Sequence, residues 1–204
     1  GLRSKATIVE AWLEARSIDL GELSWPLPTL RFLADCPYWF VENTDTPPVR
    51  VHSGPAMVAA IQNGKTGRLQ GVHLTWLTAD GTAKAEIFAP DGSPLKARKI
   101  RGALNGGHVR FCRAPEGRDP LLIAEGIETT GSAIEASGVG GWACLSLSNF
   151  SAFVPAEAVL LAFDGDEANP DQARKTKDAA VAAHASAGRG VRAVQAAAGF
   201  DFNS

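Results

Sequence analysis

Two short apolar runs, each ending in carboxylates, constrain the fold of this chain more than any other feature. The runs are Leu121-Leu122-Ile123-Ala124-Glu125-Gly126 and Leu160-Leu161-Ala162-Phe163-Asp164-Gly165-Asp166. Each has the length of a buried strand, and each ends where a parallel sheet places its ligand-binding residues. Glu125, Asp164 and Asp166 are therefore expected at one sheet edge, where their charges repel one another unless a cation lies between them. Oxygen ligands of this kind favour Mg²⁺ or Mn²⁺.

The composition is that of a globular chain. Its 204 residues are 45% hydrophobic, which is enough for one large domain or two small ones with real cores. No apolar run approaches the roughly 18 residues of a membrane span and no secretion signal is present, so we expect a soluble, cytoplasmic protein. Cys36, Cys112 and Cys144 form no Cys-x-x-Cys pair, which predicts buried thiols rather than disulfides or a zinc module. Because Gly1 stands where a methionine is expected, we expect a piece of a longer protein.

The charge is small in total but unevenly spread. The net charge is −2; residues 1–117 hold 14 Lys and Arg against 11 Asp and Glu, whereas residues 118–204 hold 6 against 11. A nearly neutral total argues against tight, sequence-independent binding of duplex DNA by this chain alone, because that affinity comes from many phosphate contacts. Local basic patches are still able to bind nucleic acid.

The amino-terminal half is expected to mix a helix with antiparallel strands. Apolar residues at helical spacing over 5–16 predict a short packing helix, and residues 45–55, rich in Pro, Thr, Ser and Gly, predict a loop. A hairpin is expected between 56–61 and 69–77, around Asn63-Gly64-Lys65-Thr66-Gly67.

Two features of this half admit both a structural and a nucleic-acid-binding interpretation. His73 falls on the polar, solvated face of the second hairpin strand, either as an ordinary exposed histidine or as a contact to a nucleotide or phosphate. The aromatic run Tyr38-Trp39-Phe40 is either part of the core or a platform on which bases stack.

Basic side chains accumulate from Gly92 to Pro115, where no acidic residue occurs. They are Lys96, Arg98, Lys99, Arg101, Arg110 and Arg113, together with His108. Lys and Arg position phosphates, while metal ions catalyse phosphoryl transfer. This basic strip therefore predicts binding of the template or of the incoming nucleotide. The alternative is a charged, solvated face.

Residues 114–119 are rich in turn formers and predict a domain boundary, with an α+β domain over 1–117 and a second domain over 118–204. In the second domain, strands alternate with helices, which predicts a parallel sheet covered on both faces. The expected elements are strand 120–124, helix 128–136, strand 142–147, strand 159–163, helix 171–186 and strand 191–197. Asn169 is expected to cap helix 171–186, and Pro170 fits its first turn.

The carboxylates indicate a metal site more strongly together than separately. Glu125 precedes a glycine where the chain must turn from strand to helix, and Asp164 and Asp166, two residues apart on extended backbone, point the same way. An isolated Asp-x-Asp is common in surface turns. Paired with a strand-Glu-Gly about forty residues earlier in a βαβ pattern, it indicates a shared metal site.

The segment from Leu121 to Asn203 resembles a Toprim domain, the catalytic module of bacterial-type primases, of type IA and type II topoisomerases, and of some nucleases. The residues that carry the resemblance are Glu125-Gly126 and Asp164-Gly165-Asp166. Glu125-Gly126-Ile127-Glu128-Thr129 and Asp201-Phe202-Asn203 are similar to the variant in phage- and plasmid-borne primases and primase-helicases. The region from 71–73 to 107–111 also resembles the part that precedes Toprim in those proteins.

The resemblance implies an α/β fold, a Toprim-like parallel sheet flanked by helices behind a smaller α+β subdomain, and metal-dependent phosphoryl transfer. It gives Glu125 the role of general acid/base or metal-shaping carboxylate, and gives Asp164 and Asp166 the role of Mg²⁺ ligands. Glu128, Glu167 and Asp201 would be outer groups of the site. The family usually carries a further Asp where this chain has Ser204.

Among Toprim chemistries, the resemblance favours a DNA primase core that makes RNA primers on a single-stranded DNA template from NTPs. A replicative helicase or helicase domain is the expected partner, and no membrane is involved. A topoisomerase is disfavoured because the only tyrosine, Tyr38, lies between Pro37 and Trp39. A Toprim nuclease and a non-catalytic scaffold that binds nucleic acid remain the alternatives.

Overall fold

The structure is a computed structural model that describes residues 2–3, 7–18, 29–43, 45–165 and 169–197. Its helices are α1 (Ile8–Glu14), α2 (Ile127–Ser137) and α3 (Pro170–Ser186), with a 3-10 turn at Leu147–Asn149. Its strands are β1 (Leu2–Arg3), β2 (Leu30–Phe40), β3 (Val49–Asn63), β4 (Leu69–Trp76), β5 (Ile87–Phe88), β6 (Pro94–Leu95), β7 (Arg98–Gly102), β8 (Gly107–Arg110), β9 (Pro120–Ala124), β10 (Gly141–Ala143), β11 (Ala158–Phe163) and β12 (Gly190–Gln195).

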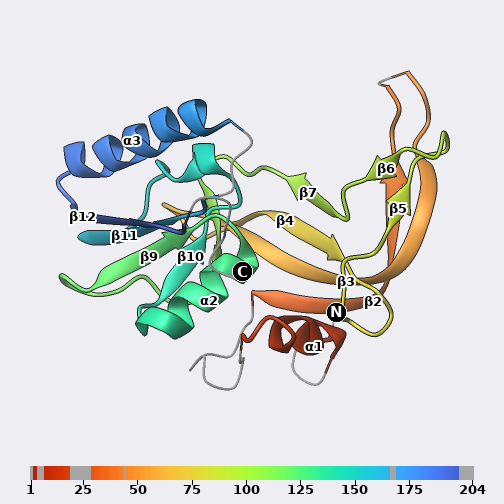
Figure 1. Cartoon of the computed structure of the whole chain (residues 1–204), viewed down its shortest axis with the longest axis horizontal. Helices are drawn as coiled ribbons and strands as arrows, with labels where there is room; N and C mark the ends of the chain where they lie inside the picture. Colours follow the sequence, from red (N-terminus) through yellow and green to blue (C-terminus); the bar gives the residue numbers. More distant parts are fainter. Residues whose placement is uncertain (1, 4–6, 19–28, 44, 166–168, 198–204) are drawn as a thin grey trace.

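One mixed sheet runs through both halves of the chain (Figure 1). Within the described residues it has ten strands in the order β1-β2-β3-β8-β10-β9-β11-β12, and β4 and β7 branch from β3. The halves meet where β8 pairs antiparallel with β10. The buried Asn149 amide bridges this joint, because its Nδ2 donates to the carbonyls of Gly107 (2.7 Å) and Cys144 (2.9 Å). The division into two domains near residue 117 stays a prediction.

The carboxyl-terminal half confirms the predicted α/β architecture. Strands β10, β9, β11 and β12 are parallel neighbours. Helix α2 lies on one face of them and α3 on the other (Figure 1), which is why β9 and β11 are apolar on both sides. Helix α3 begins as expected: the Asn169 side chain accepts a hydrogen bond from the Gln172 amide at 3.2 Å, and Pro170 occupies the first turn.

Strand β10 is shorter than the predicted strand over 142–147. The chain leaves the sheet at Leu145, which adopts a left-handed φ of 66°. Its amide donates to the Glu125 carbonyl at 2.8 Å, so the turn is fixed against the end of β9. A bulky residue in this region of φ is unusual, and here it lies beside the candidate site described below.

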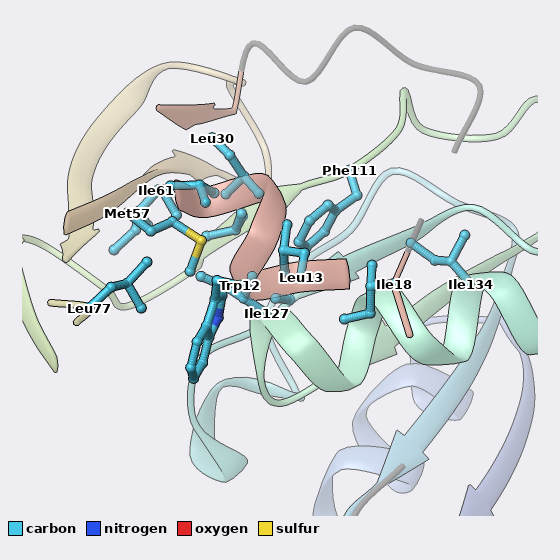
Figure 2. Close-up of a cluster of buried hydrophobic side chains, with 14 residues drawn as sticks. Trp12, Leu13, Ile18, Leu30, Met57, Ile61, Leu77, Phe111, Ile127 and Ile134 are labelled. Atoms are coloured by element: carbon cyan, nitrogen blue, oxygen red, sulfur yellow. The ribbon is translucent and has the colours of Figure 1, made fainter. Parts of the chain in front are cut away.

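Helix α1 packs between the two halves, which confirms the predicted packing helix. It is shorter than the predicted span over 5–16. Trp12, Leu13 and Ile18 are at most 2% exposed and share one core with side chains of the amino-terminal sheet and of α2. Figure 2 shows Ile127 and Ile134 of α2 in this cluster. A Cβ on Gly131 would lie 3.0 Å from Ile18 Cγ2, so α2 packs closely on the Ile18 side chain at this position.

The hairpin of β3 and β4 is confirmed, but the loop predicted over 45–55 is wrong for its second part, because β3 begins at Val49. Prolines misled the prediction. Pro55 in β3 lies at a register shift between β2 and β3, an irregularity of the ladder that tolerates proline.

Cys36 and Cys144 are buried free thiols, as expected, and Cys112 is partly buried. In the part of the chain that the structure describes, no helix is long and apolar enough to cross a membrane.

Candidate active site

Glu125 stands immediately after β9, at the edge where the parallel strands end. It lines a narrow pocket with Gly126 and Glu128 at the start of α2, Leu145 after β10, and side chains of the amino-terminal half. The first turn of α2 thus opens onto the pocket, and its positive dipole end favours anionic groups there.

Asp164 follows β11, the strand directly beside β9. Because Ala162 pairs with Ala124, the residues that follow these two strands emerge at neighbouring positions of the sheet edge. The backbone carbonyl of Asp164 accepts a hydrogen bond from Lys177 Nζ at 2.7 Å, and Lys177 is only 7% exposed. Helix α3 thus carries a buried lysine that holds the Asp164 backbone in place.

The charges of both carboxylates reach the buried Cys144 thiol. Burial raises its pKa well above the ordinary value, and the charges of Glu125 and Asp164 both raise it further. Both carboxylates therefore influence the same buried sulfur. Convergence of the predicted carboxylates on one metal site stays a prediction.

Gly165 lets the chain that leaves β12 pass directly over the backbone that follows Asp164. A Cβ at this position would clash with the carbonyl oxygens of Ala196 and Ala197, and the Ala196 amide donates to the Phe163 carbonyl at 3.0 Å. The glycine is thus required by a close backbone approach.

Basic residues of the amino-terminal half close the Glu125 pocket from the other side. Arg98 of β7 and Lys84, in the connection after β4, both line it. Lys84 Nζ lies 3.2 Å from Glu128 Oε1, and the Glu128 side chain is 17% exposed. Sequence patterns missed Lys84, because it lies outside the basic strip and reaches the carboxylates only through the fold.

The prediction that His73 lies on a solvated face is wrong. His73 and the 2%-exposed Thr75 line the Glu125 pocket, since the polar face of β4 is covered by the start of α2. Burial lowers the pKa of His73 to about 4; Glu128 opposes this shift, while Arg98 and Lys84 add to it. The imidazole is therefore neutral near pH 7 and serves as a hydrogen-bonding group rather than a cation.

The basic strip divides between several environments. Arg98, Arg101 and Arg113 are exposed, as is Lys96. Lys99 is partly buried and reaches β2. Arg110 is engaged in the structure: its Nη2 donates to the carbonyls of Asn63 (2.6 Å) and Gly64 (3.0 Å), and its guanidinium lies 4.0 Å from the Trp142 ring. Binding of nucleic acid by the strip stays a prediction.

Three of the predicted site residues, Asp166, Glu167 and Asp201, lie outside the described residues. Within the described ranges no three His, Cys, Asp or Glu side chains form a metal-binding group. The donors that are described, Glu125 and Asp164, are carboxylates at adjacent strand ends, and their hard oxygen atoms suit Mg²⁺ or Mn²⁺. The residue types present therefore fit a divalent ion.

Comparison with known proteins agrees with this architecture. Residues 1–111 match the family described as a domain of unknown function (DUF7146), and residues 120–204 match the Toprim domain family. No curated protein sequence matches the chain.

Two solved structures share the fold. The crystal structure of the Aquifex aeolicus primase (zinc-binding and RNA polymerase domains) is 15% identical with a TM-score of 0.53, and the match covers 99% of this chain and 53% of that one. The structure of the DnaG catalytic core is 17% identical with a TM-score of 0.56. That match covers 97% of this chain and 67% of the DnaG core. The chain spans about half the length of the Aquifex structure, and at these identities the likeness concerns the fold alone. The chain belongs to the family described as DUF7146, and its carboxyl-terminal part, residues 120–204, matches the Toprim domain family.

Proposed function

We propose that this chain is the catalytic core of a metal-dependent nucleotidyltransferase of the DNA primase type, which makes RNA primers on single-stranded DNA. One observation carries the proposal: Glu125, at the end of β9 beside the end of β11, opens into a pocket whose other wall is basic. The Toprim domain and the primase-like fold support a function of this class. The NTPs and the template enter as its substrates.

In this proposal Glu125, Asp164 and Asp166 hold Mg²⁺ or Mn²⁺, with Glu125 also acting as general acid/base. When bound there, the ion would lower the pKa of an attacking 3′-hydroxyl and offset charge on the reacting phosphate.

The chain's own residues contribute orientation and charge. Arg98 and Lys84 offer positive charge to the phosphates of a nucleotide bound at the mouth of the pocket. The neutral His73 offers a hydrogen bond whose strength does not depend on pH near neutrality, because its pKa lies at about 4. Lys177 keeps the Asp164 backbone fixed while ligands exchange.

A primer-synthesis assay tests the proposal. Wild-type protein with Mg²⁺ or Mn²⁺, single-stranded template and NTPs is expected to make short oligomers, and Glu125→Gln is expected to lower the rate by about 10² to 10⁴-fold. Glu116→Gln, an exposed glutamate in the turn-rich segment before β9, is the matched control and should retain full activity.

The outcomes separate the alternatives. Degradation of the DNA without primer synthesis would support the nuclease. DNA binding that is unaffected by metal and by Asp164→Asn with Asp166→Asn, together with no activity, would support the scaffold. Partnership with a helicase is a separate prediction, tested by co-purification with the replicative helicase of the same replicon.

A further inference from the structure

One carboxylate of α2 lies among basic side chains from three separate elements. Glu128 Oε1 lies 3.2 Å from Lys84 Nζ, in the connection after β4. Burial lowers the pKa of Arg16, which follows α1, and the pKa of His73 in β4, and the charge of Glu128 raises both. The Glu128 side chain is only 17% exposed, so these attractions act where water screens them incompletely.

The buried Trp12 ring of α1 holds two of these cations near one another. The guanidinium carbon of Arg16 lies 3.0 Å from the ring centroid, and Lys84 Nζ lies 5.5 Å from the same centroid. Arg16 Nη1 also donates to the Trp12 carbonyl at 3.2 Å. Trp12 shares its core cluster with Ile127, the residue before Glu128 (Figure 2). Attraction to the ring thus offsets part of the repulsion between the two cations.

Positive charge prevails around Glu128. Arg98 lines the same pocket as Lys84 and Glu128, and Arg16 lies close enough to respond to the Glu128 charge. In the proposed function Glu125 belongs to the metal site. Among the described residues of the pocket, this leaves Glu128 as the carboxylate that balances the cations.

The pocket has no room for a phosphate while Lys84 and Glu128 remain paired. Its cavity measures about 30 Å³, which is roughly the share of one water molecule in the liquid. The Lys84 side chain is 42% exposed and its stem is flexible, so the pair is able to open toward solvent. A phosphate at the mouth must compete with the Glu128 carboxylate, because both offer anionic oxygens to the same ammonium group.

We propose that Glu128 is an internal competitor of the nucleotide: in the empty site it occupies the place of a phosphate beside Arg16, Lys84 and Arg98, and an incoming phosphate displaces it from Lys84. Glu128 therefore weakens the binding of every phosphate anion at the mouth, and it pairs with Lys84 again when the anion leaves. A residue that merely positions Lys84 would have the opposite effect. The inference rests on the proposed function for the identity of the anion, a nucleotide triphosphate.

Binding of inorganic tripolyphosphate in EDTA tests the inference without metal or catalysis. Isothermal titration calorimetry at about 0.1 M salt is expected to show that Glu128→Gln binds tripolyphosphate more tightly than wild type, by about 5-fold or more. Removal of a like charge about 4 Å from a phosphate gives this factor even at the dielectric constant of water. The matched control is Glu135→Gln, which removes the same charge from an exposed position about two turns further along α2. It should change the affinity by less than about 2-fold.

A double-mutant cycle shows whether Glu128 acts through Lys84. Lys84→Met is expected to weaken tripolyphosphate binding about 5-fold or more, because one cation is lost. In the Lys84→Met background, Glu128→Gln should tighten binding by a smaller factor than it does in wild type, because the competition for Lys84 is already absent. Circular dichroism and urea unfolding check that each variant is folded.

Several results would overturn the inference. They are no binding of tripolyphosphate by either wild type or Glu128→Gln, equal or weaker binding by folded Glu128→Gln, an equal gain in Glu135→Gln, and a Glu128→Gln factor that is the same with and without Lys84. Weaker binding by Glu128→Gln would make Glu128 a positioning residue for Lys84.

Failure of the primase proposal looks different. A protein that makes no primer, yet binds tripolyphosphate more tightly as Glu128→Gln, would refute the primase assignment and retain the competitor. A wild type that makes primers, with no gain in tripolyphosphate binding by Glu128→Gln, would refute the competitor alone.

Discussion

His108 makes the fold sensitive to acid, and the effect has a calculable size. The residue lies in β8 at the joint between the halves, is 0% exposed, and stacks at 5.5 Å from the Trp142 ring. Neither ring nitrogen has a hydrogen-bond partner among the described residues. Burial lowers its pKa to about 4, and Arg110 and His184 add to the shift. The folded state therefore keeps this imidazole neutral.

The direction of the change in stability with pH follows from proton uptake. An unfolded histidine titrates near pH 6.5, so between pH 6.5 and about 4 the unfolded state binds a proton that the folded state rejects. Stability is full above pH 6.5 and falls as the pH drops. From pH 7.5 to pH 5 the loss from this one group is about 2 kcal/mol, given about 1.4 kcal/mol per proton per pH unit.

Urea unfolding of wild type and His108→Leu at pH 7.5 and pH 5 measures the effect. Leucine has a similar volume and no titrating group, so the variant is expected to change stability at pH 7.5 by less than about 1.5 kcal/mol. Between pH 7.5 and pH 5, the unfolding free energy of His108→Leu should fall by about 2 kcal/mol less than that of wild type. Val109→Ala is the control: Val109 packs in the core on the other face of β8, so the substitution should lower the unfolding free energy equally at the two pH values. Parallel pH profiles for wild type and His108→Leu would refute the reasoning.

Two further changes test the support of the Asp-x-Asp motif. Gly165→Ala should cost about 1–3 kcal/mol in urea unfolding because its Cβ clashes with backbone carbonyls, whereas Gly190→Ala makes only a 3.5 Å contact and should cost less than about 0.5; equal values would contradict the close approach. Lys177→Met keeps the apolar stem but removes the donor to the Asp164 carbonyl, with an expected loss of about 1–3 kcal/mol. The exposed Lys175→Met should be neutral, and a neutral Lys177→Met would show that the bond adds no stability.

The parallel half was predictable because its signals are local. Strands β9 and β11 are buried on both faces and therefore read as unbroken apolar runs. Asn169 and Pro170 mark the start of helix α3 in the sequence. The position of the carboxylates follows from these strands. The residue after a parallel strand lies at the carboxyl edge of the sheet, whatever the strand's place in the strand order.

The amino-terminal half was harder because its decisive contacts are distant in sequence. Residues 49–55 look like a loop by composition, but the long pairing of β3 with β2 makes them a strand. His73 looks exposed by alternation, yet α2, more than fifty residues later, covers that face. No local pattern reveals which partner covers a polar face.

The sequence by itself determined the order of strands and helices in the Toprim half and the chemistry of its strand ends, because burial and capping act through neighbouring residues. Only the tertiary structure decided what those ends face. Lys84 and Arg98 reach the Glu125 pocket, and Lys177 reaches Asp164, because separate elements pack together. Charge contacts of this kind depend on distances through space, and these are set only when the two halves share one sheet and one core.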